Sequence, residues 1–544
     1  MQPKLTDAAR RRLLAGMLAA ATVPVTGAAN AAPPSAATPA ATPAATGSLT
    51  VAFGAESTTL DPVKISAGVD HYFVGQIFEM LVRRNAALKD ENWLAESWKL
   101  ETGKDGKPVL DVQLRKGVRF HNGDPLTAED FEFSWQRQRD PKGSFFSHYV
   151  SSIERFEIVD PHHFKLHFKE PDAQFIVGNM QLWAMPKKYI QKVGEEEFAR
   201  KPVGTGPWKF VSRTVKDELK LEAFDGYWNK EKRPGVKELT IKVIPEDLTR
   251  VAAFKTGKVD FIDNVPPSMV DEFRKMPGVK TVTLVSGNNL FLNFNTQMAK
   301  SPFNDVRVRQ AAAHAIDVDA IIKRVLFGQG ERYAQVGKES NGYDPALKPY
   351  PFDQKRAREL LKQAGYPNGF DTPCYNLTTP REPGVKEVGE AMYAYLSSVG
   401  IRCQVRNLEY GAWISLGKRG RSGPPEMDGV LSWMWSQGLP GDPGLAWSGH
   451  LHSYQGGGGW GTYSYTNDPE VDALVEKQRH TMDPAARTAL LKQIARLKQE
   501  RVLGGLPTYR PLVTFAWRDN KIDYVPWPIR DYWRSFQEVS WKQR

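Results

Sequence analysis

Apolar residues recur with two different periods along the chain. In the segment 164–170, Phe164, Leu166 and Phe168 alternate with polar or charged residues, which predicts a strand that is buried on one face. In 354–364, apolar residues recur every three or four positions, which predicts a helix that Asp353 caps and Gly365 ends. Strand-like and helix-like segments alternate in this way after residue 48, separated by short turns. The pattern is typical of an α/β protein.

Residues 370–408 form the clearest local unit. A strand pattern at 370–378 is followed by a helix pattern at 386–400 and a second strand pattern at 401–408. This order predicts a right-handed βαβ crossover, and therefore two parallel strands. The two cysteines of the chain, Cys374 and Cys403, fall on these strands. A disulfide is possible in an oxidising compartment, but a bond between neighbouring parallel strands is geometrically awkward, so the sequence leaves the pairing open.

The first 48 residues differ in composition from the rest. Three consecutive arginines, Arg10–Arg12, precede a weakly apolar run that ends in small residues near Ala31. We interpret 1–31 as a signal peptide of the Sec or twin-arginine type, and 32–48, rich in Ala, Pro and Thr, as a disordered leader. No cysteine lies near the cleavage site, so we expect no lipid anchor. No other apolar run has the length of a membrane span, and we expect a protein exported to the periplasm.

Chain length and charge narrow the class of protein. A chain of 544 residues is long enough for two or three domains. Its 15 tryptophans imply much rigid aromatic surface, either in cores or in a binding cleft. The formal charge is +11, of which Lys4, Asp7 and Arg10–Arg12 of the predicted signal contribute +3. The remaining charge of about +8 is spread along the chain, which argues against nucleic-acid binding.

Sequence signatures of enzymes are largely absent. The chain has no HExxH, paired CxxC, GxSxG or GxxxxGK[ST] motif, and GTGPWK at 204–209 lacks the third glycine of a dinucleotide-binding turn. His163 and His167 share a polar strand face with lysines, which would repel a metal cation. His450 and His452 could share one face of a strand, but no acidic or thiolate partner is close in sequence. We therefore expect no catalytic residues, no metal site and no cofactor.

The order of motifs along the chain is more specific than any one of them. It includes TLDP (59–62), LRKGVRFHNGDPLTAEDFEFSW (114–135), PVGTGPWKF (202–210), NNLFLNFNT (288–296), FNDVRVRQAAAHAIDVDAII (303–322) and DPEVDALVEKQRHTMDPAARTALLKQI (468–494). This series resembles the extracellular solute-binding proteins of family 5, the peptide- and nickel-binding group that serves ABC importers. The resemblance covers essentially all of 48–544.

The resemblance implies a two-lobed clamshell of the type II periplasmic-binding-protein kind, with mixed sheets and three domains. The core domain of lobe 1 would comprise 49–82, 202–295 and 508–544, with 83–201 as an inserted domain. Lobe 2 would comprise 296–507. The chain would cross between the lobes near Phe294, Asn295 and Pro507, which would form the hinge. A solute would bind between the lobes, and closure would depend on contacts that are made only in the closed form.

A pair of tryptophans marks the candidate ligand site. In SWMW (432–435), Trp433 and Trp435 point to the same side of a predicted strand. Members of the resembled family line their cavity at this position, although simple packing of the pair is the alternative. The candidate pocket residues from both lobes that the resemblance implies are Trp433, Met434, Trp435, Ser66, Ala67, Gly68, Tyr72 and Tyr509.

The segment after SWMW departs from the peptide-binding members of that family. Those proteins carry an Asp there that pairs with the α-ammonium of the ligand. This chain has Ser436-Gln437-Gly438-Leu439 instead, and its first acid is Asp442. An ammonium group buried without an anionic partner would be costly. Either Asp442 takes this role, or the ligand has no free amine at this place.

The sequence therefore predicts the substrate-binding component of an ABC importer, a monomer that delivers one solute to an inner-membrane permease. Short peptides are the first ligand class to consider. An oligosaccharide or an opine-like solute is the alternative, because aromatic walls with few charges suit such solutes equally. An exported α/β enzyme and a periplasmic chaperone or sensor partner are the other functions that the sequence leaves open.

Overall fold

The structure is a computed structural model of the chain. It describes residues 46–544 apart from 66–67, 86–88, 141–143, 145–146, 178–181, 297, 299, 379–381, 383, 410–411, 414–415, 417–428, 437–440, 454–465, 525–528, 531–535 and 543–544. The predicted signal peptide and most of the predicted leader lie outside the described residues, as do Ser66 and Ala67. For Trp433, Met434 and Trp435 the backbone is described but the side chains are not.

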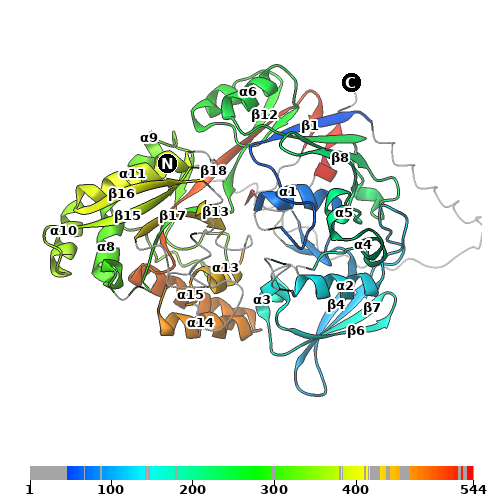
Figure 1. Cartoon of the computed structure of the whole chain (residues 1–544), viewed down its shortest axis with the longest axis horizontal. Helices are drawn as coiled ribbons and strands as arrows, with labels where there is room; N and C mark the ends of the chain where they lie inside the picture. The colour runs from blue at the N-terminus through cyan, green and yellow to red at the C-terminus, as the bar shows by residue number, and fades with distance from the viewer. Residues whose placement is uncertain are drawn as a thin grey trace, which may run out of the picture. The chain divides into compact units, whose positions relative to one another are not determined.

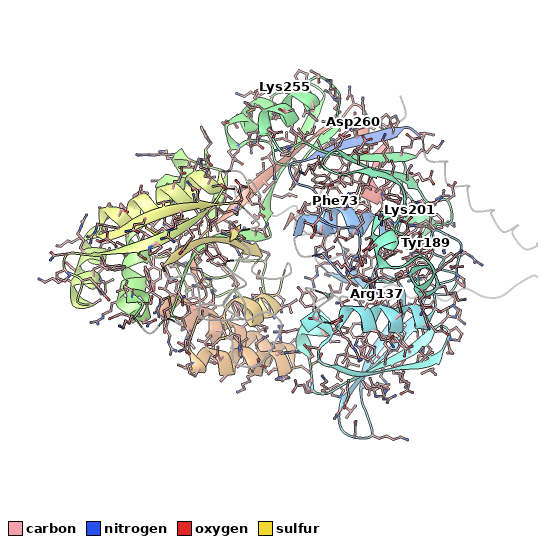
Figure 2. All side chains as sticks on the ribbon, viewed as in Figure 1. Phe73, Arg137, Tyr189, Lys201, Lys255 and Asp260 are labelled. Atoms are coloured by element: carbon pink, nitrogen blue, oxygen red, sulfur yellow. A yellow bond between two sulfur atoms is a disulfide. The ribbon has the colours of Figure 1, made fainter. Side chains whose placement is uncertain are left out.

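A mixed sheet, 13 strands among the described residues, runs through the fold (Figure 1). Its first half-sheet contains β8 (Trp208–Thr214), β9 (Glu218–Ala223), β10 (Glu238–Val243), β1 (Ser48–Phe53), β11 (Phe261–Ile262) and β12 (Val279–Ser286). β1 is parallel to β10 and β11, whereas β8, β9 and β10 are antiparallel. Helix α1 (Gly68–Ile77) packs on this half-sheet through Phe73, whose ring lies 6.1 Å from that of Phe53 (Figure 2).

An antiparallel sheet is inserted between β1 and β8 in chain order. Its strands are β4 (Ala95–Thr102), β5 (Pro108–Leu114), β7 (His163–Phe168) and β6 (Ile153–Asp160), with β2 (Val82–Arg84) and β3 (Asp90–Asn92) before them. The predicted alternation is confirmed, because Phe164, Leu166 and Phe168 are all buried. Helix α2 (Ala128–Gln138) carries Arg137 (Figure 2), which donates to the buried Asp61 at 2.7 Å. This ion pair joins the inserted sheet to the chain that follows β1.

The second half-sheet contains β16 (Ile401–Leu408), β15 (Phe370–Leu377), β17 (Val430–Ser436), β13 (Asn288–Phe294) and β14 (Gly330–Arg332). The predicted βαβ unit is confirmed, with α11 (Val385–Ser398) between the parallel strands β15 and β16. Cys374 and Cys403 form a disulfide, with Cα atoms 5.4 Å apart. The two cysteines lie diagonally across the strand pair, since Cys403 pairs with Thr372 and Cys374 with Val405. The diagonal offset allows a bond that directly opposed positions would make awkward.

Most of the helices after β13 are well capped. An Asp side chain at the N-cap accepts from a backbone amide in α8 (Val306–Ala315), α9 (Val318–Arg324), α10 (Gln354–Gln363), α14 (Pro469–His480) and α15 (Pro484–Arg501). Helix α13 (Gly444–His450) has no side-chain cap at its N-cap position. The prediction for α10 is confirmed, because the Asp353 carboxylate accepts from the amide of Arg356 at 2.8 Å and Gly365 follows with φ +92°. His450 ends a helix, so the idea that it shares a strand face with His452 is wrong.

Shorter helices precede β13. They are α3 (Ala173–Val177), α4 (Lys187–Val193), α5 (Glu195–Arg200), α6 (Asp247–Lys255) and α7 (Val270–Arg274). Within the described ranges, none of the helices is both long enough and apolar enough to cross a membrane.

Strand β18 (Leu506–Arg518) belongs to both half-sheets. Its residues 512–518 pair with β12 and its residues 506–509 pair with β13 (Figure 1). The other passage of the chain between the half-sheets lies where β12 ends at Ser286 and β13 begins at Asn288. The two half-sheets are therefore joined by two neighbouring antiparallel connections.

The predicted hinge residues divide between two positions. Pro507 lies on β18 where that strand pairs with β13. Phe294 and Asn295 instead lie at the far end of β13, where Phe294 stacks on Phe303 with ring centroids 4.9 Å apart. The first passage is therefore upstream of the position expected from the sequence. A hinge motion at either passage stays a prediction.

Candidate functional site

Strand β13 lies between the two strands that carry predicted aromatic site residues. It pairs with β17 on one side and with the start of β18 on the other. Met434 and Tyr509 pair with the same residue, Leu290. Two strand spacings separate their backbones, roughly 10 Å. The fold thus brings the SWMW segment and Tyr509 together, although they are far apart in the sequence.

Two buried polar atoms on these strands have no hydrogen-bond partner. Asn289, which lies opposite Trp435, is 2% exposed, and Tyr509 is 0% exposed. In the part of the chain that the structure describes, neither Asn289 Oδ1 nor the Tyr509 hydroxyl contacts a donor or acceptor. Buried polar groups are nearly always hydrogen-bonded, and each unsatisfied group costs about 1–3 kcal/mol. Among the described residues, these two atoms therefore lack the hydrogen-bond partners that buried polar groups normally have.

A buried carboxylate lies at the same end of β13. Glu382 Oε1 accepts from Ser286 Oγ at 3.1 Å and from Asn288 Nδ2 at 2.8 Å. Asn288 pairs with Ser436, the residue at which β17 ends. Burial, together with the charge of Glu382, raises the pKa of Tyr509, so the Tyr509 hydroxyl keeps its proton at neutral pH. The hydroxyl can then donate to a ligand acceptor.

Glu382 follows the carboxyl end of β15, which is parallel to both β16 and β17. In open α/β sheets, ligands bind beyond the carboxyl ends of the parallel strands. The sequence analysis missed Glu382 and Asn289 as candidate site residues. For Glu382 a signal was present, because an acid shortly after a predicted parallel strand falls at this edge of the sheet. For Asn289 no sequence signal was present. It is distinguished only by a buried side-chain oxygen that has no hydrogen-bond partner within the described chain, which the structure alone shows.

The candidate residues near α1 occupy a different environment. Gly68 opens α1, and Tyr72 is buried in the core of the first half-sheet, stacked on Phe53 with ring centroids 5.6 Å apart. Packing accounts for this position of Tyr72. A ligand contact by Gly68 or Tyr72 stays a prediction, and Ser66 and Ala67 lie outside the described residues.

Asp442 is held in a buried ion pair. Both of its oxygens accept from the guanidinium of Arg487, one of them at 2.8 Å, and Asp442 Oδ1 also accepts from the amide of Gly444 at 2.9 Å. Asn341 Nδ2 donates to the same carboxylate at 3.3 Å. Removing one partner of a buried ion pair typically costs 3–5 kcal/mol. Asp442 could bind a ligand ammonium only by giving up Arg487, so the geometry does not favour the role suggested by its sequence position.

The histidines considered as metal ligands have other partners. His163 Nε2 lies 2.9 Å from Asp111, which also pairs with Lys165, and His167 Nε2 lies 2.7 Å from Glu157. Across the described residues, no three His, Cys, Asp or Glu side chains come together as a possible metal site. The charged face of β7 is thus an ion-paired surface.

Comparison with known proteins agrees with this architecture. Residues 91–451 match the bacterial extracellular solute-binding proteins, family 5, in the region described as the middle of the family. The chain belongs to this family. Its members are solute-binding proteins rather than enzymes, and the resemblance stated from the order of motifs is confirmed.

Several family 5 relatives have known ligands. The glutathione-binding protein GsiB of Escherichia coli K12 is 28% identical over 369 residues, 67% of this chain and 70% of that protein. The periplasmic binding protein DppA of Helicobacter pylori, solved with the peptide STSA, has a TM-score of 0.78 and 26% identity over 91% of this chain and 98% of its own. AgaA of A. tumefaciens R10, solved with agropinic acid, has a TM-score of 0.78 and 26% identity over 92% and 99%.

Family 5 membership confirms two predictions from the sequence. The fold is a multi-domain α/β fold of the type II periplasmic-binding-protein kind, with mixed sheets. The role is that of a solute-binding component of an ABC importer, for which peptides are a plausible ligand class and other solutes are also consistent.

Proposed function

We propose that this family 5 protein is exported to the periplasm, captures a short peptide where β17, β13 and β18 pair, and delivers it to an inner-membrane ABC permease. Two of the relatives, GsiB and DppA, support the peptide class, since their ligands are a tripeptide and the peptide STSA. We expect a monomer that binds without catalysis and needs no cofactor.

The observation that carries this proposal is the pair of unsatisfied buried atoms, Asn289 Oδ1 and the Tyr509 hydroxyl. Asn289 Oδ1 needs a donor, and the Tyr509 hydroxyl can donate to an acceptor. A peptide main chain offers an N–H and a C=O at each residue, so it supplies both kinds of group. Beside them, Glu382 offers an anionic group at the carboxyl edge of the parallel strands. We assign the contact with a ligand cation to Glu382 rather than to Asp442.

Ligand class can be tested by thermal unfolding with defined solutes. A ligand at about 100 times its Kd stabilises a protein by about 2.7 kcal/mol, a shift that a fluorescence melt detects. We expect di- to pentapeptides to raise Tm and oligosaccharides to leave it unchanged. Native mass spectrometry of protein purified without unfolding should retain a peptide mass. Stabilisation by oligosaccharides alone would contradict the proposal.

The site can be tested with a matched pair of asparagine variants. Asn289→Ala removes the unsatisfied acceptor, and we expect it to weaken binding of the best peptide about five-fold, the equivalent of about 1 kcal/mol. Asn368→Ala changes an exposed asparagine on the turn before β15 and should leave the Kd unchanged. Isothermal titration calorimetry measures both. Equal affinities for the two variants would remove Asn289 from the site.

An opine is the second candidate ligand. AgaA, solved with agropinic acid, has the same TM-score and identity to this chain as DppA has. Opine-like conjugates of an amino acid and a sugar carry hydrogen-bonding groups that Asn289 and Tyr509 could also use. Including agropinic acid in the thermal unfolding series separates the two classes. Recovery of an unchanged ligand after long incubation would support binding without turnover, whereas a new product would contradict it.

A further inference from the structure

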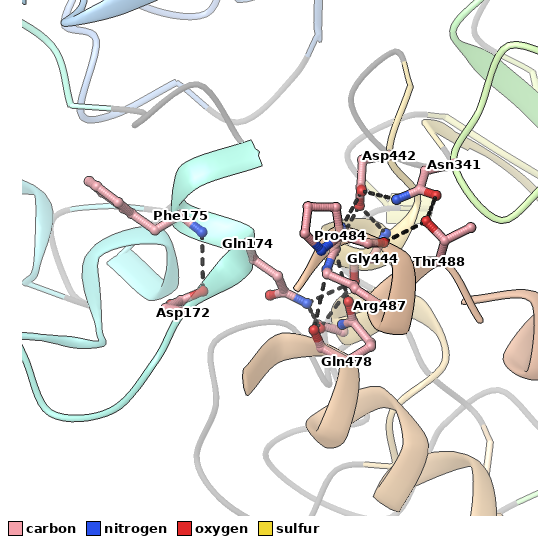
Figure 3. A network of polar contacts seen from close by, with 11 residues as sticks. Asp172, Gln174, Phe175, Asn341, Asp442, Gly444, Gln478, Pro484, Arg487 and Thr488 are labelled. Carbon is pink, nitrogen blue, oxygen red and sulfur yellow. Dashed lines mark hydrogen bonds and ion pairs between the residues drawn. The ribbon is translucent and has the colours of Figure 1, made fainter. Parts of the chain in front are cut away.

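A set of polar contacts joins the inserted part of the chain to helices α13 and α14. The four contacts that define it join residues 270–309 positions apart in the sequence. They are Gln174, Asp172 and Pro171 on the inserted side, and Gly444, Ser448, Arg479 and His480 on the helical side. Figure 3 shows Gln174 extending from α3 toward Gly444 and the ion-paired groups behind it. We name this set the interlobe latch.

Gln174 lies at the centre of the interlobe latch. Its side chain is buried, and Nε2 donates to the carbonyl of Gly444 at 3.0 Å and to Ser448 Oγ at 2.6 Å. Both of these acceptors belong to the first turns of α13. When the two parts separate, the Gln174 amide exchanges these partners for water. The contact therefore favours the closed arrangement by a modest amount, because water replaces most of a lost hydrogen bond.

Contacts from α14 accompany Gln174. Arg479 of α14 donates to Asp172 Oδ2 at 3.2 Å, and His480 Nδ1 lies 2.8 Å from the carbonyl of Pro171. Asp172 also caps α3 by accepting from the amide of Phe175 at 3.1 Å. This cap holds the Asp172 carboxylate in place independently of Arg479. The inserted side therefore presents a preoriented acceptor to Arg479.

The Asp442–Arg487 ion pair holds the other side of the interlobe latch. Asp442 Oδ1 accepts from the amide of Gly444, and Arg487 also donates to Gln478 Oε1 at 2.9 Å (Figure 3). A Cβ atom on residue 444 would lie 2.3 Å from Arg487 Nη2, so only glycine fits against this pair. The pair fixes the peptide unit whose carbonyl receives Gln174. This gives the buried Asp442 a role that needs no ligand.

We propose that the interlobe latch sets the balance between open and closed lobes, and that Asp442 and Arg487 are positioning residues for it. The inference rests on the proposed function, in which a solute is enclosed between two lobes. A solute that binds the closed form has an apparent affinity proportional to the closed fraction. The interlobe latch therefore tunes affinity for every ligand by the same factor, whereas the proposed site where β17, β13 and β18 pair selects among ligands.

Distance measurement between the lobes tests this proposal without a solute. Nitroxide labels on Lys104→Cys and Lys355→Cys, two exposed positions in the inserted hairpin and in α10, give the distance distribution by double electron–electron resonance. We expect Gln174→Ala to lower the ratio of closed to open molecules about five-fold, the equivalent of about 1 kcal/mol. Arg479→Ala should act in the same direction.

Matched controls come from the second half of the chain. Gln354 donates to Ser398 Oγ at 2.8 Å within that half, and Arg496 pairs there with Asp344. Gln354→Ala and Arg496→Ala should leave the distance distribution unchanged. If Gln174→Ala and Arg479→Ala give the same distribution as these controls, the proposal is wrong. An open distribution for the unsubstituted protein would also overturn it.

A double-variant comparison tests the positioning role. If Asp442 acts through Gly444 and Gln174, then Asp442→Asn shifts the distribution, but Gln174→Ala with Asp442→Asn shifts it no further than Gln174→Ala alone. Fully additive shifts would show that Asp442 acts separately, and would overturn its positioning role. The distances are measured without any solute, so the absence of peptide binding in the thermal series would refute the proposed ligand and leave this result standing.

Discussion

Lys498 tests how strongly burial shifts the pKa of a charged side chain in this fold. It lies on α15, is 2% exposed, and its Nζ donates to the carbonyls of Leu503 and Gly504 at 3.0 and 3.4 Å. Burial lowers the pKa of Lys498 from 10.5 to about 7. The folded protein therefore binds fewer protons than the unfolded chain between pH 7 and 10.5, so stability rises with pH across this window.

The magnitude follows from the two pKa values. Below pH 7 the full cost of burying the charge applies, about 5 kcal/mol for a shift of this size. Between pH 7 and pH 9 about 2 kcal/mol of that cost is removed. Lys498→Met deletes the charge, so the difference in unfolding free energy, variant minus unsubstituted protein, should fall by about 2 kcal/mol from pH 7 to pH 9.

Urea unfolding at the two pH values measures this difference. Lys492→Met, an exposed position on the same helix, is the control and should show the same difference at both pH values. Every other titrating group is common to the compared proteins and cancels. If the Lys498→Met difference is also independent of pH, then Lys498 has the same pKa in the folded and unfolded states. Burial would then not lower its pKa, and the argument fails.

Two further predictions concern local geometry. Replacing Cys374 and Cys403 by Ala opens a loop with a sequence separation of 29, and should lower the unfolding free energy by roughly 3–4 kcal/mol in urea titrations; an unchanged midpoint would contradict this. A Cβ atom on Gly204 would lie 2.0 Å from the carbonyl oxygen of Ile77, whereas one on Gly75 in α1 would meet nothing within 4 Å. Gly204→Ala should therefore lower Tm by many degrees, and Gly75→Ala should raise it slightly because alanine favours the helix. Equal Tm changes for the two variants would refute the steric argument.

Local patterns allowed much of the fold to be predicted. The alternation at 164–168, the Asp353 cap and the βαβ unit all depend on residues close together in sequence, and all three are confirmed. The disulfide stayed open because strand order alone does not give the register that places Cys374 diagonal to Cys403. The passage at Ser286–Asn288 was missed for a similar reason, since it depends on which strands pair.

The candidate site depends on contacts between distant residues, which sequence patterns do not reveal. Position after SWMW suggested that Asp442 meets a ligand ammonium, but Arg487, 45 residues away, already pairs with it. Glu382 was not considered, although its contact with Asn288 spans 94 residues and brings an acid to the end of β17. For both Asp442 and Glu382, the contact with a distant residue determines which role the carboxylate can take. Only the tertiary structure shows that contact.

One short segment of the chain links the two features for which we propose functions. Strand β17, opposite Asn289, ends at Ser436, and α13, which receives Gln174, begins at Gly444. In the two proposals above, the strand that borders the ligand site and the helix that carries the acceptors of Gln174 are thus near neighbours in the chain. Asp442 lies between these two elements and pairs with Arg487 on α15, so it ties the chain just before α13 to a second helix.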